Sequence, residues 1–170
     1  MKFRNIFIAG LISMSSGLAM AQSNTEHKEP AKKESFNQNV LTSEVAQTMA
    51  LAAERAAQKE GFAIVVSIID NHGNLKYFNR MDGTSFGSIE VSQLKALTSA
   101  KFPVSSKTLA ERSANLPGNP YAAIPGMLVL EGGLPIFNQA GAHIGAIGIS
   151  GATPELDAKF AQAGIDSLVK

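Results

Sequence analysis

The sequence predicts an α+β domain in which helices cover both faces of an antiparallel sheet of about five strands. Two observations predict this class. Short apolar segments occur in pairs separated by turns rich in Gly and Asn, which is typical of β-hairpins. Segments with apolar residues at helical spacing precede, separate and follow these pairs. Helices are therefore expected for both faces of the sheet.

Residues 1–21 are expected to be a signal peptide. Lys2 and Arg4 precede an uncharged apolar stretch, and the tripeptide 19–21 has the small–x–small pattern of a cleavage site, which predicts cleavage before Gln22. An uncleaved membrane anchor is the alternative, although the apolar stretch is short for a membrane span. Cleavage leaves a periplasmic or secreted chain of 149 residues with a net charge of −1 and no membrane span.

Residues 22–40 are expected to form a flexible linker, because their charges are mixed and they contain few apolar side chains to bury. Residues 41–170 are expected to form one domain. The chain has no cysteine, which excludes disulfides, Cys-ligated zinc, iron–sulfur clusters and covalent haem attachment. Its net charge is close to zero, which argues against a nucleic-acid-binding protein.

The first half of the domain contains a helix and a hairpin. Thr42 or Ser43 can cap a helix that ends at Gly61, and its alanine-rich stripe allows close approach of a neighbour. The apolar run 62–69 fits a strand covered on both faces. Residues 75–80 are expected to pair with it across a turn at 70–74.

The second half is expected to contain three helices and a second hairpin. Helices are predicted over residues 88–101 and 106–113, and residues 114–126 contain too much Pro and Gly for regular structure. Two strands, 127–131 and 134–137, are expected to flank Gly132-Gly133, and 143–150 is expected to form a buried strand. Thr153 caps the last helix, with Pro154 at its first position.

Several classes of catalytic site find little support. Ser150 lacks the spacing of a nucleophile elbow, and the three acids Asp70, Asp82 and Glu131 lie at turns or strand ends, where acids commonly cap the backbone. His72 and His143 do not share a spacing that forms a metal site. No metal site and no catalytic residue is therefore assigned.

The glycines at 145, 148 and 151 do not match a dinucleotide-binding motif. We interpret them as sites where a helix or another subunit lies directly on the strand. The end of this run, at Gly151–Thr153, could also bind an anion at a helix N-terminus.

Small side chains around one long cation also line one face of the predicted helix 88–101, in a stripe formed by Ser88, Ser92, Lys95 and Ser99. This stripe is either a solvated face or a surface that a flat ligand or a facing helix approaches closely. In the second case Lys95 and the nearby Arg80 could pair with a carboxylate.

Four separated blocks resemble the GlcG/HbpS family, also called the haem-degrading domain family. The blocks are Asp70-x-x-Gly73-x-Leu75-x-x-Phe78-x-Arg80-Met81-Asp82-Gly83, Lys95-Ala96-x-Thr98, Gly132-Gly133-x-Pro135-Ile136, and Gly145-Ala146-Ile147-Gly148-Ile149-Ser150-Gly151-x-x-x-Glu155-x-Asp157. The resemblance spans about residues 42–170. The same domain occurs at the C-terminus of PduO-type proteins. It implies a profilin-like α/β/α sandwich on a five-stranded antiparallel sheet, homo-oligomers that include octamers, and non-covalent haem binding or degradation by some members.

The family's usual Phe-x-x-Pro-Thr-x-x-Leu segment is altered here. It corresponds to Phe102–Leu109, where the proline lies two positions earlier and Ser106 replaces the threonine. If that hydroxyl contacts haem iron in some relatives, Ser106 is its equivalent.

The leading hypothesis is an exported, homo-oligomeric haem-binding protein that degrades haem or senses haem or iron. The candidate haem-binding residues are Lys95, Arg80, Ser106, His72 and Ser92, with the haem propionates placed toward Lys95 or Arg80. Two alternatives stay open, namely a non-catalytic module that binds a small carboxylate metabolite and a structural or sensory oligomer. The sequence leaves open whether there is turnover.

Overall fold

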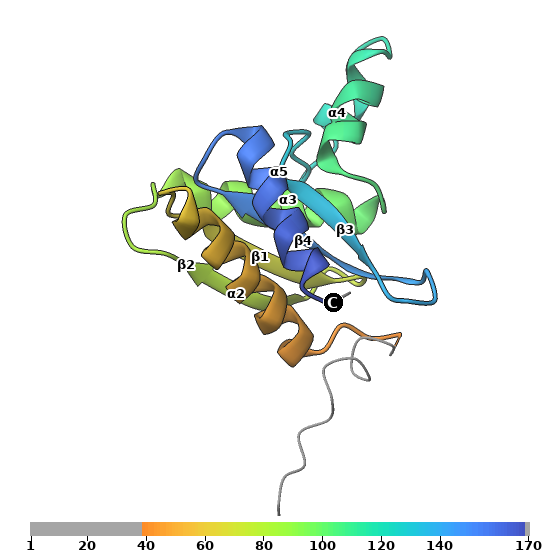
Figure 1. Cartoon of the computed structure of the whole chain (residues 1–170). Coiled ribbons are helices and arrows are strands. Elements are labelled where there is room, and N and C mark those ends of the chain that lie inside the picture. Colours follow the sequence, from red (N-terminus) through yellow and green to blue (C-terminus); the bar gives the residue numbers. More distant parts are fainter. Residues whose placement is uncertain (1–38, 169–170) are drawn as a thin grey trace, which may run out of the picture.

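In a computed structural model of the chain, which describes residues 39–168, a four-stranded sheet lies between two layers of helices (Figure 1). Helices α2 (Ser43–Lys59) and α5 (Pro154–Asp166) pack against each other on one face. Helix α3 (Gly87–Lys101) packs against the other face. The predicted α+β class, with an antiparallel sheet and helices on both faces, is therefore confirmed.

The strands are β1 (Val65–Asp70), β2 (Leu75–Arg80), β3 (Gly133–Phe137) and β4 (His143–Ser150), in the order β2-β1-β4-β3. All three pairings are antiparallel. The buried strands β1 and β4 lie in the centre and the more exposed strand β2 lies at one edge, as expected from their apolar content. The predicted hairpin of β1 and β2 is confirmed.

The helix caps expected from the sequence are present. The Thr42 hydroxyl accepts a hydrogen bond from the Val45 N–H (3.2 Å), and the Thr153 hydroxyl accepts one from the Leu156 N–H (3.4 Å). These bonds satisfy backbone donors that have no partner within the helix. Gly61 follows α2 at φ +79°, a left-handed conformation that favours glycine and ends the helix.

Helix α3 lies directly on strand β4 at Gly148. A Cβ atom at this position would overlap the Ser92 carbonyl oxygen and the Ala96 backbone nitrogen. The prediction that the glycine-rich strand is a site of close packing is thus confirmed, and the element in contact at Gly148 is a helix of the same chain.

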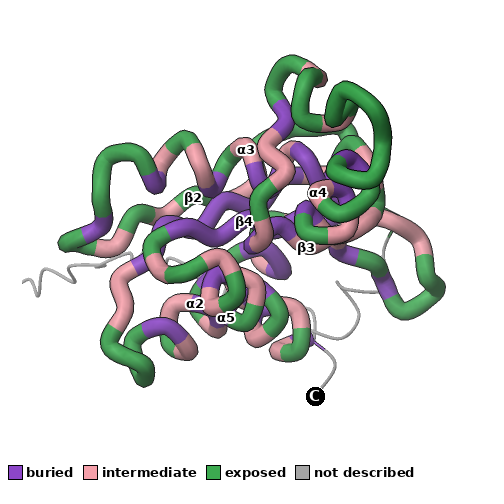
Figure 2. Tube along the Cα trace, turned by 90° about the horizontal axis from the view of Figure 1, so that it is seen from above, coloured by how far each residue is buried: buried purple, intermediate pink, exposed green. Residues whose placement is uncertain are grey.

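The core is concentrated between the sheet and the α2–α5 layer (Figure 2). Its fully buried side chains come from both helices and from the central strands, and they include Met49, Val66, Ile68, Ile147, Ile149 and Phe160. A smaller cluster, formed by Ile69, Ala96, Ala100 and Ala146, lies under α3.

The fifth predicted strand is absent from the described chain, because residues 127–131 are not a strand. Two of their backbone groups bond to side chains instead of to a neighbouring strand. The Leu128 N–H donates to the Thr98 hydroxyl (2.8 Å), and the Leu130 carbonyl accepts from the Ser106 hydroxyl (2.6 Å). The expected hairpin around Gly132-Gly133 is therefore wrong, and β3 instead forms its hairpin with β4.

Helix α4 (Ser106–Ala114) projects from the body of the domain (Figure 1). A single 3₁₀ turn, Pro120–Ala123, interrupts the otherwise irregular segment that follows. The predicted signal peptide and nearly all of the predicted linker lie outside the described residues. Within residues 39–168, no helix is both long and apolar enough to cross a membrane.

Candidate functional site

The five haem-binding residues predicted from the sequence do not converge on one site. His72 and Arg80 lie at opposite ends of the β1–β2 hairpin, because Arg80 pairs with the first residue of β1 and His72 lies in the turn. Ser92 and Lys95 lie on α3, and Ser106 begins α4. Ser92, Lys95 and Ser106 are buried, whereas His72 and Arg80 are exposed.

Lys95 forms a buried ion pair with Asp157 on α5. The Nζ atom lies 2.7 Å from Asp157 Oδ2 and also donates to the Ile149 carbonyl (3.0 Å), and the two side chains are 1% and 2% exposed. Burial raises the pKa of Asp157, while Lys95 and the Ala152 N–H oppose this rise. The predicted role of Lys95 as a partner for a ligand carboxylate does not fit this position, since its charge is already matched by Asp157 inside the protein.

Ser92 also has internal partners. Its hydroxyl lies 2.8 Å from the Ser67 hydroxyl on β1 and donates to the Ile89 carbonyl (2.9 Å). All four residues of the predicted small-residue stripe on this helix are buried: Ser88, Ser92, Lys95 and Ser99. The stripe therefore faces the protein's own sheet and is neither a solvated face nor an exposed ligand surface.

Ser106 holds the start of strand β3 in place. Its hydroxyl donates to the Leu130 carbonyl (2.6 Å) and accepts from the Gly133 N–H (2.9 Å). The residue has no exposed surface. A ligand could reach this hydroxyl only if the segment around Leu130 moved away.

Arg80 organises the loop that follows β2. Its Nε donates to the Thr84 hydroxyl (2.9 Å) and its Nη2 donates to the Thr84 carbonyl (2.7 Å). The side chain also lines a polar hollow with Asn79, Asp82 and Glu54. Arg80 thus uses part of its donor capacity locally and remains exposed.

His72 is presented at the tip of the hairpin by a turn that Asp70 organises. One Asp70 carboxylate oxygen accepts the His72 N–H (2.9 Å) and the Asn74 N–H (2.8 Å). Partial burial by itself would raise the pKa of Asp70, but these hydrogen bonds, a further one from the Asn74 side chain and the nearby His72 together lower it. An ionised Asp70 therefore keeps the tip in one conformation, with the imidazole on the surface.

Two shallow hollows adjoin this tip on the α3 side of the sheet, with volumes of about 190 Å³ and about 160 Å³. They share Gly73 and Leu97. The first is also lined by Ile69, Leu75 and Gln93, and the second by Asn71, His72, Ala100 and Lys101. We call the surface formed by His72, Gly73, Leu75, Leu97 and Lys101 the hairpin–α3 surface.

The hairpin–α3 surface combines three chemical features. It has an exposed imidazole, an apolar patch that includes Leu75 (54% exposed), and the Lys101 ammonium, which donates to the Pro125 carbonyl (3.2 Å). Such a combination suits a flat apolar ligand with an anionic edge. Among residues 39–168, no three His, Cys, Asp or Glu side chains gather to hold a metal ion by themselves.

The sequence identified only His72 among these residues. Leu97 and Lys101 lie one helical turn apart on α3, outside the stripe that begins at Ser88. Leu75 was assigned to a strand and to a block of the family resemblance, but not to a site. The available signal was the spacing of Gln93, Leu97 and Lys101 at i, i+4 and i+8, which places a second, mixed stripe on the same helix.

Comparison with known proteins assigns the chain to a family. A family model described as "Haem degrading protein HbpS-like" matches residues 41–166. The chain belongs to this HbpS-like family. Protein GlcG of Escherichia coli strain K12 is 31% identical over 111 residues, which are 65% of this chain and 81% of that protein. The resemblance to a GlcG/HbpS family is therefore confirmed.

Solved structures agree with the assignment. The crystal structure of HbpS is 37% identical with a TM-score of 0.69, and the match covers 74% of this chain and 87% of that one. The crystal structure of a PduOC:heme complex is 28% identical with a TM-score of 0.68, and the match covers 75% of this chain and 94% of that one. The HbpS-like chain described here thus shares its fold with a protein that has been crystallised with haem.

Proposed function

We propose that this HbpS-like protein binds haem non-covalently at the hairpin–α3 surface. Family membership and the haem complex of a structural neighbour support this function. The observation that carries the position is the exposed His72 imidazole beside an apolar hollow with a cation at its edge. Imidazole nitrogen is a common axial ligand of haem iron, and no other part of the predicted site presents one.

Each residue of the surface would have a separate task. His72 would hold the iron, Leu75 and Leu97 would cover the apolar ring and exclude water, and Lys101 would pair with a propionate. Lys101 replaces Lys95 in this role, since Lys95 is occupied by Asp157. Arg80 lies at the far end of the hairpin and is left outside this site.

The size of the hollows suggests that a second subunit takes part. Each is smaller than the roughly 300–1,000 Å³ of common small-molecule sites, so this surface would cover only part of a haem. The proposal therefore includes a homo-oligomer, in which another copy of the chain covers the rest of the haem ring. When bound, haem supplies redox chemistry at its iron, and the proposal extends to haem degradation or haem sensing on this basis.

Export is also part of the proposal. It rests on the charged start, apolar stretch and small–x–small tripeptide within residues 1–22. Mass spectrometry of the protein recovered from the periplasm or the medium should find a chain that begins at Gln22. An intact N-terminus in membrane-bound protein would contradict it.

A hemin titration of the mature protein tests haem binding. We expect a saturable shift of the Soret band, and His72→Ala should weaken binding at least tenfold and change the spectrum because the iron loses its ligand. Lys101→Ala should weaken binding by a few fold without changing the spectrum. Lys107→Ala is the matched control, since Lys107 is a surface lysine on α4 paired with Glu131 (3.1 Å).

Two results would overturn the proposal in different ways. If hemin gives no saturable shift, haem binding itself is wrong. If the shift is normal but His72→Ala behaves as the unchanged protein, haem binds elsewhere on the molecule.

A further inference from the structure

A groove runs between helices α2 and α5 on the outer surface of the domain, on the other side of the sheet from the hairpin–α3 surface. It has a volume of about 420 Å³. Three alanines line it, two from α2 and one from α5: Ala52, Ala56 and Ala163. Because alanine side chains are short, the groove is hollow where larger residues would fill the space between two packed helices.

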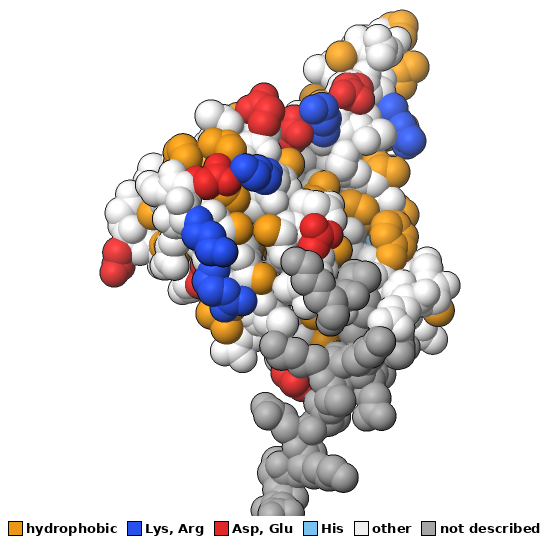
Figure 3. Space-filling model, viewed as in Figure 1, with side chains coloured by type: hydrophobic (Ala, Val, Ile, Leu, Met, Phe, Trp, Pro, Cys, Tyr) orange, Lys and Arg blue, Asp and Glu red, His pale blue; other side chains and the backbone are white. Residues whose placement is uncertain are grey.

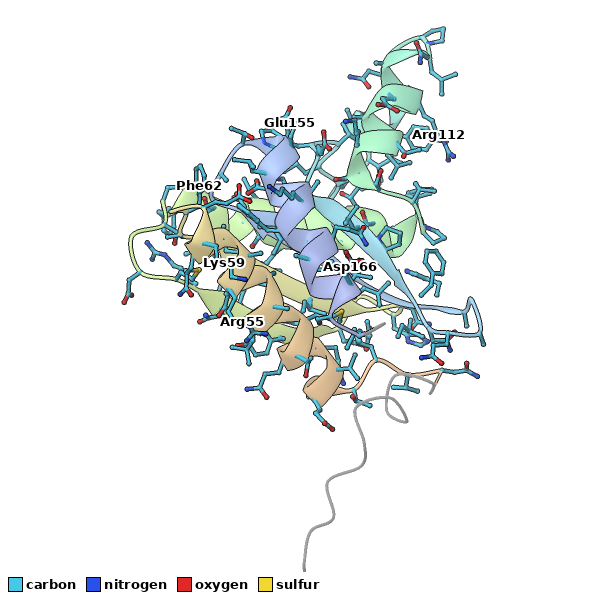
Figure 4. All side chains as sticks on the ribbon, in the orientation of Figure 1. Arg55, Lys59, Phe62, Arg112, Glu155 and Asp166 are labelled. Atoms are coloured by element: carbon cyan, nitrogen blue, oxygen red, sulfur yellow. The ribbon has the colours of Figure 1, made fainter. Side chains whose placement is uncertain are left out.

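Two cations border this groove. Arg55 and Lys59 lie one turn apart on α2 and are both exposed (Figure 4). Their side chains form a continuous basic ridge beside the apolar surface of the alanines (Figure 3). Within the described part of the chain, neither one forms an ion pair.

The acid that lines the groove is already paired. Glu60 lines one end of the groove, but its carboxylate is paired with Lys159 at 2.6 Å. Asp166 on α5 is not among the residues that line the groove, and its carboxylate accepts a hydrogen bond from the Gln162 amide (2.8 Å). The groove therefore keeps an uncompensated positive charge along its α2 side.

We propose that the α2–α5 groove binds a small dicarboxylate. The planar Arg55 guanidinium matches one carboxylate in a two-point contact, and the Lys59 ammonium matches a second one about one helical turn away. A short carbon chain between the two carboxylates lies on the three alanines. A simple inorganic anion would satisfy the charges but would leave the apolar floor unused. The volume is within the range of small-molecule sites, roughly 300–1,000 Å³.

Calorimetric titration of the mature protein with succinate tests this site. We expect saturable binding that Arg55→Gln weakens at least tenfold and Arg55→Gln/Lys59→Gln abolishes. Ala163→Leu keeps both charges but fills the groove, so it should also abolish binding. Arg112→Gln removes an exposed arginine from the projecting helix α4 and should leave the affinity unchanged (Figure 4).

The neutral analogue succinamide and the simple anion sulfate separate the contributions of charge and shape. We expect no binding of succinamide and at least tenfold weaker binding of sulfate. If Ala163→Leu unfolds at a lower temperature than the unchanged protein, Ala52→Leu fills the groove from the other helix and replaces it.

Absence of saturable succinate binding would overturn the proposal. Equal binding of sulfate and succinate, unaffected by either leucine variant, would also overturn it, since that result indicates only a general attraction of anions. Neither result bears on haem binding, because His72 and Lys101 lie on the opposite face.

Discussion

The two faces of the sheet contact their helices through different chemistry. Toward α2 and α5 the sheet presents aliphatic side chains, such as Val66, Ile68 and Ile147, which pack around Phe160. Toward α3 it presents only a small apolar cluster around Ile69, and groups such as Ser67 and Gly148 meet a helix face of small and polar residues. Both interfaces are buried, so water does not explain the difference.

The difference has consequences for stability. On the α2–α5 face, burial of apolar surface holds the layers together. The free energy that this burial contributes changes gradually with side-chain size. On the α3 face, backbone approaches backbone, and buried polar groups form specific bonds such as Lys95 to Asp157. We therefore expect the α3 face to tolerate much less change than the α2–α5 face, and three substitutions test this expectation.

The largest effect is expected at Gly148. Gly148→Ala places a Cβ atom against the backbone of Ser92 and Ala96, which cannot move without separating α3 from the sheet. We expect a loss of about 4 kcal/mol or more in the free energy of unfolding, or no folded protein. Urea unfolding followed by circular dichroism measures this loss.

Gly87→Ala is the matched control for this substitution. Gly87 begins the same helix and has no atom within 4 Å of the position a Cβ would take. Its effect should stay within about 0.5 kcal/mol. Similar stabilities of the two variants would show that α3 does not rest on β4 as described.

The next effect is expected at Lys95. Lys95→Met leaves the buried Asp157 carboxylate without its cation, which should lower the free energy of unfolding by about 3–5 kcal/mol at neutral pH. The loss should depend on pH. Burial raises the pKa of Asp157 above its ordinary value of 3.8. In the variant, the stability associated with protonated Asp157 is therefore fully present below pH 3.8. It is lost as the pH rises and the buried carboxyl group ionises without a cation beside it.

Urea unfolding of Lys95→Met at several pH values checks this expectation. The deficit relative to the unchanged protein should be smallest near pH 4 and grow toward neutral pH. Adding Asp157→Asn should restore more than half of the loss, because the amide carries no charge and its oxygen can still accept the Ala152 N–H. A pH-independent deficit that the second substitution does not reduce would contradict the assignment of a buried charge pair.

The smallest effect is expected on the aliphatic face. Ile147→Val removes one buried methylene from the α2–α5 core, which should cost about 1 kcal/mol in the free energy of unfolding. The same urea measurement applies. A loss as large as that of Gly148→Ala would remove the contrast between the two faces.

Local patterns were sufficient to predict most of the elements. Capping by Thr42 and Thr153 depends on residues within one helical turn, and the β1–β2 hairpin depends on a short turn, so both can be read from neighbouring residues. The glycines of β4 also indicated close packing correctly, since only a missing side chain permits backbone contact. The sequence placed His72 in the turn at 70–74, and in the structure it is exposed there.

Tertiary structure decided what local patterns left open. Residues 127–131 have the composition of a strand, but hydroxyl groups from two distant helices take their backbone bonds. Lys95 belongs to a block of the family resemblance, but its role depends on Asp157, which is 62 residues away in the sequence. Leu97 and Lys101 belong to the candidate site only because the end of α3 lies against the hairpin tip. The sequence by itself therefore determined the helices and the β1–β2 hairpin, since these depend on interactions between near neighbours. The folded chain determined which polar side chains are buried and which face a ligand, because that depends on residues far apart in the sequence.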